Sequence, residues 1–167
     1  MINDNNICVK QRIKELIIDY ICIIVYLLAL LGVSMGFFLG IFREIPNFSE
    51  LQSQLIATFS SVIPVVIFFS IWDYTNGSIG KRKAWLKLCY KHKSFKASMT
   101  RNIVKFLPWQ LAHIGVIHGM YTDFDLVAII FTNTSMGLAI IMLVMGLVRK
   151  DKRHLGDLIA GTQVQVR

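Results

Sequence analysis

Residues 20–42 read YICIIVYLLALLGVSMGFFLGIF and contain no charged side chain. About 20 apolar residues is the length that an α-helix needs to cross the hydrocarbon core of a bilayer. The run is longer than the apolar core of about 7–15 residues in a cleaved signal peptide, and no A-x-A site follows it. We therefore expect a membrane-spanning helix that is retained in the protein.

Three further uncharged stretches follow, at residues 55–72, 106–121 and 126–148. Hydrophobic residues make up 54% of the chain and charged residues 17%, whereas a soluble domain typically carries about 25% charged residues. So little polar surface excludes a water-soluble globule. We expect an all-α membrane protein, a single domain over residues 1–167 built as a four-helix transmembrane bundle, with its first helix at about residues 16–42.

The basic residues divide unequally among the connections between these stretches. Four crossings place 17 of the 18 Lys and Arg residues on one side of the membrane and only Arg43 on the other. Cytoplasmic loops of membrane proteins carry the excess of Lys and Arg. This partition predicts a bacterial inner-membrane protein with cytoplasmic N- and C-termini. It also favours a crossing at residues 106–121, because the basic segments before this stretch and after residue 148 then share a side.

The net charge of +8 indicates partners of opposite charge. The basic residues lie directly beside apolar spans, where anionic lipid head groups are the nearest anions and each contact is worth about 1 kcal/mol. We therefore expect anionic lipid at the cytoplasmic face, and no nucleic acid. The chain also contains Cys8, Cys22 and Cys89, which we expect to be free thiols in this reducing compartment.

The basic connection at residues 73–105 is too long for a simple turn. Within it, residues 86–91 alternate weakly between apolar and polar side chains, as in a half-buried strand. Residues 95–106 suit a short basic helix that leads into the third span. We predict a strand and a helix on the cytoplasmic side.

Arg12, Glu15 and Asp19 are spaced by three and four residues, which places them on one stripe of the first helix. Arg12 and Asp19 are about 10 Å apart along the axis, too far for a good direct ion pair, so Asp19 needs a partner on another helix. A carboxylate at the centre of a span costs roughly 2.5–3.5 kcal/mol on insertion scales. Asp19 is therefore either a structural lock between helix ends or a carboxylate that binds a proton or cation.

Two more motifs accompany this stripe: Gly80-Lys81-Arg82, and Asp157-Leu158-Ile159-Ala160-Gly161-Thr162. Together with Arg12 and Asp19, they resemble the RDD family of bacterial membrane proteins, which is named for one arginine and two aspartates. Asp157 takes the place of the second aspartate. The resemblance covers nearly the whole chain and implies a multi-spanning inner-membrane protein, for which cation/proton exchange has been suggested, and not an enzyme.

The charged motif residues all fall at the same membrane face. We predict that they form one interhelical ion-pair network, in which removal of one partner costs about 3–5 kcal/mol. The residues of this predicted cluster and its flanking motifs are Arg12, Asp19, Gly80, Lys81, Arg82, Arg153, Asp157, Gly161 and Thr162.

Glycines recur at a spacing of four residues in two of the expected helices. Gly32, Gly36 and Gly40 form a ridge on the first helix, and Gly115 and Gly119 form a shorter one on the third. Small residues at this spacing let membrane helices approach closely. The ridges indicate helix packing, either within one chain or between copies in a homo-oligomer.

Polar residues also occur inside the expected spans. His113 and His118, five residues apart, do not share a helix face, and no Cys or carboxylate lies in their stretch, so we expect no metal site. Thr132, Asn133, Thr134 and Ser135 cannot all face lipid. The two histidines are either neutral and hydrogen-bonded or part of a proton relay. The four polar residues form either interhelical hydrogen bonds or, with the histidines, a polar path through the bundle.

No nucleophile motif, phosphate loop or metalloprotease motif occurs, and we expect neither catalysis nor a cofactor. Two functions stay open. One is transporter-like movement of a cation, proton or small solute through a polar path. The other is a non-transporting accessory or scaffold subunit of a larger membrane complex, which binds anionic lipid or a partner through its basic face.

Overall fold

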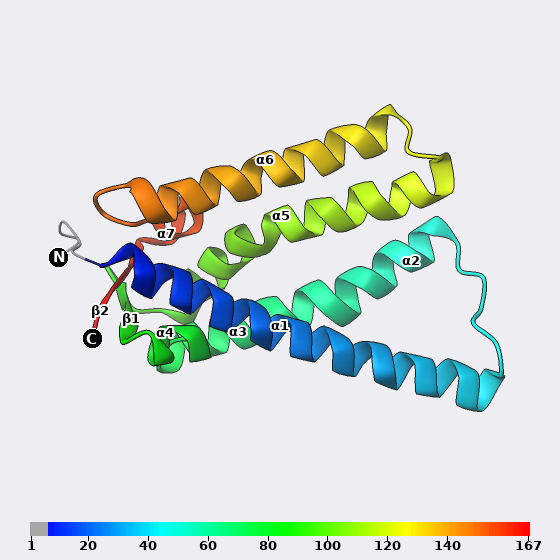
Figure 1. The fold of residues 1–167 in the computed structure, drawn as a ribbon, viewed down its shortest axis with the longest axis horizontal. Helices are drawn as coiled ribbons and strands as arrows, with labels where there is room; N and C mark the ends of the chain where they lie inside the picture. Colours follow the sequence, from blue (N-terminus) through cyan, green and yellow to red (C-terminus); the bar gives the residue numbers. More distant parts are fainter. Residues whose placement is uncertain (1–6) are drawn as a thin grey trace.

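Residues 7–167 are described by a computed structural model, in which four long helical stretches run side by side (Figure 1). The helices are α1 (Val9–Phe37), α2 (Glu50–Ala57), α3 (Ile63–Thr75), α4 (Ile79–Lys83), α5 (Phe95–Thr122), α6 (Leu126–Val148) and α7 (Leu155–Ala160). The strands are β1 (Leu86–Tyr90) and β2 (Thr162–Val166). Two π-helical segments, Phe38–Phe42 and Thr58–Val62, extend α1 and join α2 to α3.

Within the described residues, three helical stretches are long and apolar enough to cross a membrane: Val9–Phe42, Glu50–Thr75 and Leu126–Val148. They contain the stretches predicted at residues 16–42, 55–72 and 126–148. The remaining long helix, α5, has 28 residues but is less apolar, because it includes Lys, Arg, His and Pro side chains. The structure is thus mostly helical with three candidate spans, and the crossing at residues 106–121 stays a prediction.

The second stretch is continuous from Glu50 to Thr75 despite Pro64 in its interior. Proline has no N–H, so the Ser60 carbonyl four residues earlier lacks its usual helical donor. The hydroxyl of Tyr26 on α1 donates a hydrogen bond to this carbonyl. A neighbouring helix therefore satisfies the backbone group that Pro64 releases, as membrane helices require.

Helices α5 and α6 pack against each other over most of their length (Figure 1). Their close approach depends on Gly115, where an added Cβ would lie 2.6 Å from Thr132 Oγ1. The Ser135 hydroxyl donates to the Pro108 carbonyl at 2.6 Å and ties the same two helices. At Gly119 an added Cβ would meet the ring of Phe124 at 2.6 Å, so the α5 glycines serve packing within the chain.

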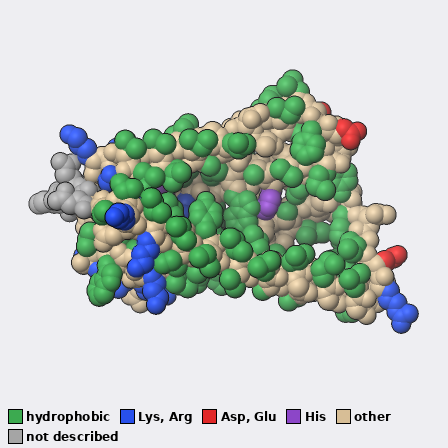
Figure 2. Space-filling view, viewed as in Figure 1, with side chains coloured by type: hydrophobic (Ala, Val, Ile, Leu, Met, Phe, Trp, Pro, Cys, Tyr) green, Lys and Arg blue, Asp and Glu red, His purple; other side chains and the backbone are tan. Residues whose placement is uncertain are grey.

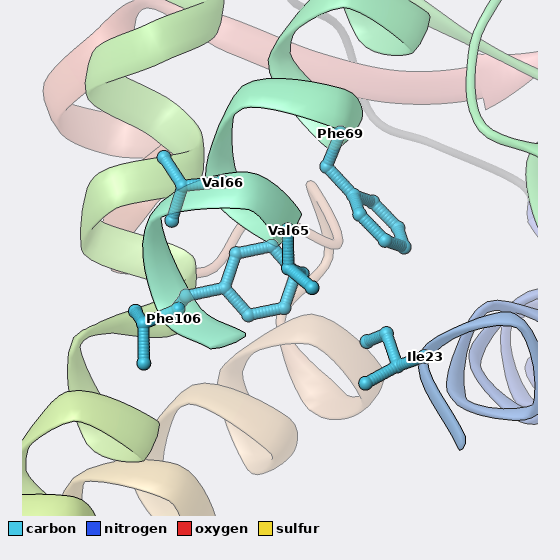
Figure 3. Packing of buried hydrophobic residues seen from close by; sticks show 6 residues of the cluster. Ile23, Val65, Val66, Phe69 and Phe106 are labelled. Atoms are coloured by element: carbon cyan, nitrogen blue, oxygen red, sulfur yellow. The ribbon is translucent and has the colours of Figure 1, made fainter. Parts of the chain in front are cut away.

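The apolar core lies between α1, α3 and α5 (Figure 3). The rings of Phe69 and Phe106 pack edge to face, with centroids 5.2 Å apart. Their buried neighbours are Ile23, Val62, Val65 and Val66. This cluster fixes the relative position of the three helices just beside the charged residues of α1.

A small antiparallel sheet covers one end of the bundle. Strand β1 was predicted, and it pairs with β2 from Leu86 opposite Val166 to Tyr90 opposite Thr162. Leu86 and Val164 have no exposed surface and pack with Ile7 and Ala84. Strand β2, α4 and α7 were not predicted.

Helix α1 packs on α4 at one end, and Figure 1 shows its other half diverging from α2 toward the connection that joins them. Nothing lies within 4 Å of a Cβ built on Gly32, Gly36 or Gly40. The α1 glycine ridge therefore makes no close packing within the described chain.

Basic side chains gather at the end of the bundle that carries α4, α7 and the sheet, whereas acidic side chains mark the opposite end (Figure 2). We call the first of these the basic end. Cys8, Cys22 and Cys89 are all free thiols.

Candidate functional site

The site begins with the α1 stripe, whose Arg12, Glu15 and Asp19 are all buried. The Arg12 guanidinium donates to Glu15 Oε2 at 2.6 Å, one turn along the helix. Asp19, a turn further, makes no pair with Arg12 and turns to the α3–α4 connection. Its oxygens accept hydrogen bonds from the Ser78 hydroxyl and the Gly80 N–H, both at 2.8 Å.

Gly80 permits this contact between α4 and α1. A Cβ at this position would lie 2.6 Å from Asp19 Oδ1 and would also meet the Glu15 carbonyl. Real Cβ atoms do not approach so closely, so any side chain here pushes the two helices apart. The close contact between α4 and α1 thus explains why the Gly-Lys-Arg motif has a glycine at this position.

Lys81 occupies the centre of the cluster, with no exposed surface. Its ammonium lies 2.9 Å from Asp73 Oδ1 and 3.2 Å from Glu15 Oε1, so it joins α1, α3 and α4. Burial alone would lower the pKa of Lys81, but Asp73 and Glu15 outweigh this effect and raise it above its usual value. Lys81 is therefore a permanent cation.

Arg101 of α5 continues the network from α3 to α7. Its guanidinium donates to Asp73 Oδ2 and Asp157 Oδ1, each at 2.6 Å, and Asn102 adds a 3.2 Å hydrogen bond to Asp73. Burial alone would raise the pKa of Asp157, but the Arg101 guanidinium holds it well below its usual range. Thr162 also donates to Asp157, at 2.8 Å.

His154 caps α7 beside this pair. Burial lowers the pKa of His154 to about 3, so the ring is neutral. Its Nδ1 accepts the Gly156 N–H at 3.0 Å, and its backbone N–H donates to Asp157 Oδ2 at 3.4 Å. The ring Nε2 lies 3.2 Å from Arg101 Nη2 and 3.3 Å from Asp157 Oδ2. The cap of α7 and the ion network therefore share one carboxylate.

Lys105 is the most loosely held member of the cluster. Its ammonium lies 3.9 Å from Asp19 Oδ2 and over the rings of Phe69 and Phe106, at 4.6 and 5.1 Å from their centroids. With Lys105 included, four cations meet four carboxylates: Arg12, Lys81, Arg101 and Lys105 with Glu15, Asp19, Asp73 and Asp157. A balanced set of this kind offsets the desolvation that each charge would suffer alone.

A cavity of about 600 Å³ opens directly on this network. Its floor carries charged and polar groups of Arg12, Glu15, Asp19, Arg101, Lys105 and His154. Its walls are mostly apolar and come from α1, α5 and α6, with Trp109 on one side and Ile140 and Leu143 on another. The volume lies within the range of about 300–1,000 Å³ that is usual for ligand sites.

Of the predicted cluster, the structure brings Arg12, Asp19, Lys81 and Asp157 together. Arg82 is exposed and takes no part. Arg153 instead donates to two backbone carbonyls, those of Asp157 and Thr162, both at 2.8 Å. Gly161 ends α7 with φ of +62°, a conformation that glycine adopts readily.

The predicted polar-path residues do not form one group. His118 lies near the end opposite the basic end, 2.7 Å from Glu50 and 3.4 Å from Asp125. His113 packs against Trp109, with ring centroids 5.5 Å apart. Thr132 and Ser135 face α5, whereas Asn133 and Thr134 are exposed.

The sequence reasoning did not single out Asp73, Arg101, Lys105, Ser78 or His154 as members of the cluster. Asp73 carried a usable signal, because it is the one acidic residue between positions 51 and 122, directly before nine basic residues. Arg101 and Lys105 belong to the basic connection at residues 73–105, where charge alone does not distinguish exposed from buried side chains.

Three apolar helical stretches are long enough to cross a bilayer, and buried charges join the first two of them at one end. These features define a helical membrane protein. More specifically, the chain belongs to the RDD family, whose sequence model matches residues 9–161. No curated protein and no solved structure matched the chain. Family membership confirms the resemblance drawn from Arg12, Asp19 and the two later motifs.

Proposed function

We propose that this RDD protein is transporter-like and holds a small charged solute in the cavity during its passage across the membrane. The supporting observation is that the buried ion network forms the floor of a cavity with apolar walls. Fixed charges of both signs inside an otherwise apolar bundle can take the place of the water molecules that hydrate such a solute. The role proposed is not enzymatic.

This proposal includes a topology of four crossings, with α5 as the third. A helix of 28 residues is about 42 Å long, enough for the bilayer with its head-group regions. The Lys and Arg residues at the basic end favour a cytoplasmic location for that end, in the inner membrane of a bacterium. The C-terminus belongs to that side, and so does the N-terminus, which itself lies outside the described residues.

The Asp19–Lys105 pair is the natural point for a solute to open the network. Its 3.9 Å separation exceeds the 2.6–3.2 Å of the cluster's other ion pairs. Asp19 would retain Ser78 and Gly80 as donors, and Lys105 would retain its ring contacts. Separating this pair therefore costs less than separating any other.

A route beyond the cavity is supported by Lys105, Trp109 and His113, which follow one another at four-residue spacing on one stripe of α5. Among the described residues, His113 Nδ1 and Thr132 Oγ1 are buried without a hydrogen-bond partner. Buried polar atoms of this kind are normally paired. Water or a moving solute can supply the missing partners.

Ion flux in reconstituted vesicles tests the proposal, with Na⁺, K⁺ and H⁺ as the ions measured. We expect Asp19→Asn, Lys105→Gln and His113→Ala to lower flux at least about tenfold, the effect of roughly 1.4 kcal/mol. Asn133→Ala is the matched control, because Asn133 is an exposed α6 residue. Lys105→Gln preserves the Ser78 and Gly80 bonds to Asp19 and so separates transport from folding.

Absence of flux for all three ions, or flux that none of the three variants changes, would contradict transport of these ions.

One observation supports the alternative of an accessory subunit. In the half of α1 that points away from the basic end, the side chains of Val25, Leu28 and Val33 are 60–72% exposed. The glycine ridge in the same half has no neighbour within 4 Å of its would-be Cβ atoms. A helix from a second copy or from a larger complex would fit this face.

A further inference from the structure

The charged side chains on the floor of the cavity differ in how many of their hydrogen-bonding groups have partners within the protein. Within residues 7–167, the Arg12 guanidinium donates from Nη1 alone, to Glu15. Arg12 is only 5% exposed, and its Nη2 extends across to α6, 3.6 Å from where a Cβ on Gly146 would lie. An arginine has five N–H donors, so most of those on this buried group are unused.

The ammonium of Lys105 also has unused hydrogen-bond donors. Its separation of 3.9 Å from Asp19 is too long for a hydrogen bond, and its other close partners are the faces of two aromatic rings. Both cations line the cavity. The floor therefore offers donors from two side chains on two different helices.

The carboxylates of the floor are already occupied. Glu15 accepts from Arg12 at 2.6 Å and lies 3.2 Å from Lys81, and Asp19 accepts from Ser78 and Gly80. The third lining cation, Arg101, is occupied as well, because it pairs with Asp73 and Asp157 at 2.6 Å. The unused donors of Arg12 and Lys105 therefore fit an anion.

The rest of the cavity suits an alkyl chain. Its walls include Leu27, Trp109 and Met142, and the lining residues Ile24, Ile140 and Leu143 are themselves 47–58% exposed. The cavity thus reaches the outer, lipid-facing surface between α1 and α6, and Figure 2 shows this face of the molecule hollowed. A molecule can enter from the side, without leaving the bilayer.

The dimensions match one leaflet. The part of α1 that lines the cavity, from Arg12 to Leu27, rises about 22 Å at 1.5 Å per residue. One leaflet with its head groups is roughly 20–22 Å thick. A head group at Arg12 and Lys105 would lie at the level of its neighbours in the leaflet at the basic end.

We propose that the cavity binds an anionic phospholipid of that leaflet, with the phosphate on Arg12 and Lys105 and an acyl chain in the groove between α1 and α6. Arginine suits a phosphate because its planar donors match two of the oxygens. The inference goes beyond the proposed function, because it places a membrane lipid in the cavity where that function places a small solute. Binding of the lipid can be measured without any transport.

Fluorescence quenching provides the test, because Trp109 lines the cavity. In a Trp72→Phe, Trp85→Phe background, Trp109 is the remaining tryptophan. The probe is phosphatidylglycerol with brominated acyl chains, at low mole fraction in vesicles of unbrominated phosphatidylcholine. Brominated phosphatidylcholine at the same fraction measures the contact with bulk lipid.

We expect phosphatidylglycerol to quench Trp109 well beyond the phosphatidylcholine level. Arg12→Gln and Lys105→Gln should each weaken the apparent affinity about tenfold, the loss of one charge-assisted hydrogen bond. The matched control Arg82→Gln removes a charge from the same end at an exposed residue and should change the affinity less than about twofold. Two positions test the site even if one variant folds poorly.

Equal quenching by the two phospholipids, or equal loss in Arg82→Gln and Lys105→Gln, would overturn the proposal. Quenching by a brominated fatty acid with none by phosphatidylglycerol would overturn the phospholipid assignment. Inorganic phosphate that removes the phosphatidylglycerol signal at millimolar concentration would point to a free anion and overturn it as well. Ion flux that fails while selective quenching persists would contradict the transport of those ions and leave the lipid site standing.

Discussion

Adjacent basic residues of this chain have opposite environments. Lys81 is fully buried between two carboxylates, whereas the neighbouring Arg82 is exposed on the same short helix. The difference arises from Ser78, which caps α4 through the Lys81 N–H, and from Gly80, which brings that turn against α1. A family motif of two consecutive cations therefore contains one structural residue and one surface residue.

Arg101 is the residue on which we expect the network to depend most, because it alone links Asp73 to Asp157. Arg101→Met leaves two buried carboxylates short of a partner. We expect the free energy of unfolding to fall by about 3–5 kcal/mol. Arg82→Met, a change of the same type at an exposed site, should alter it by less than about 0.5 kcal/mol.

Titration with sodium dodecyl sulfate in mixed micelles measures both variants against the wild-type chain. Helix content followed by circular dichroism gives the unfolding midpoint. If Arg101→Met unfolds at the same midpoint as Arg82→Met, the network does not hold the helix ends together.

At the scale of elements, the two glycine ridges differ although their sequences look alike. Gly115 lies against Thr132 of α6, whereas Gly36 has no neighbour within 4 Å of its would-be Cβ. Gly115→Leu must push α5 away from α6, and we expect a loss of about 2–3 kcal/mol, in the range of overpacked cores. Gly36→Leu is the matched change on α1 and should leave the unfolding midpoint of the monomer almost unchanged.

The same detergent titration measures this pair of variants. A destabilised Gly36→Leu would show that the α1 ridge packs against another helix in the purified protein. An unchanged Gly115→Leu would contradict the close α5–α6 contact.

Most long elements could be predicted because hydropathy is a local property. Residues 126–148 coincide with α6, and β1 follows the weak alternation at residues 86–91. Strand β2 pairs with a segment more than 70 residues earlier, and its five residues have no distinctive pattern of their own. Asp73 was missed for a related reason. It follows Trp72 at the expected end of a span, and its role depends on ion pairs with Lys81 and Arg101, which lie 8 and 28 residues further along the chain.

At the scale of the whole molecule, the charges serve two purposes that the sequence alone does not separate. Eight charged residues from α1, α3, α4, α5 and α7 are joined inside the basic end. Most of the remaining Lys and Arg residues there, such as Arg82, Lys83 and Lys87, are exposed and available to lipid head groups. Buried cations of the first kind fix helix ends, and exposed cations of the second kind set orientation.

The proposed topology makes α5 a full crossing although it is the least apolar of the long helices. Cysteine labelling tests this in a background with Cys8, Cys22 and Cys89 changed to Ser. Single cysteines at Lys93 and Asp123 flank α5, and both positions are exposed. We expect a membrane-impermeant maleimide to label Asp123→Cys from outside intact cells and Lys93→Cys only in inverted membrane vesicles.

Asn47→Cys and Lys150→Cys are the matched controls, since the first lies in the connection after α1 and the second follows α6. Asn47 should label from outside and Lys150 from inside. Labelling of positions 93 and 123 from the same side would mean that both ends of α5 lie on one side of the membrane, so that α5 does not cross it. Because α6 is long and apolar enough to cross by itself, Lys150 would then lie on the opposite side from Lys93. The ion network forbids that result, because Arg101 near the start of α5 and Asp157 just beyond α6 are joined at 2.6 Å.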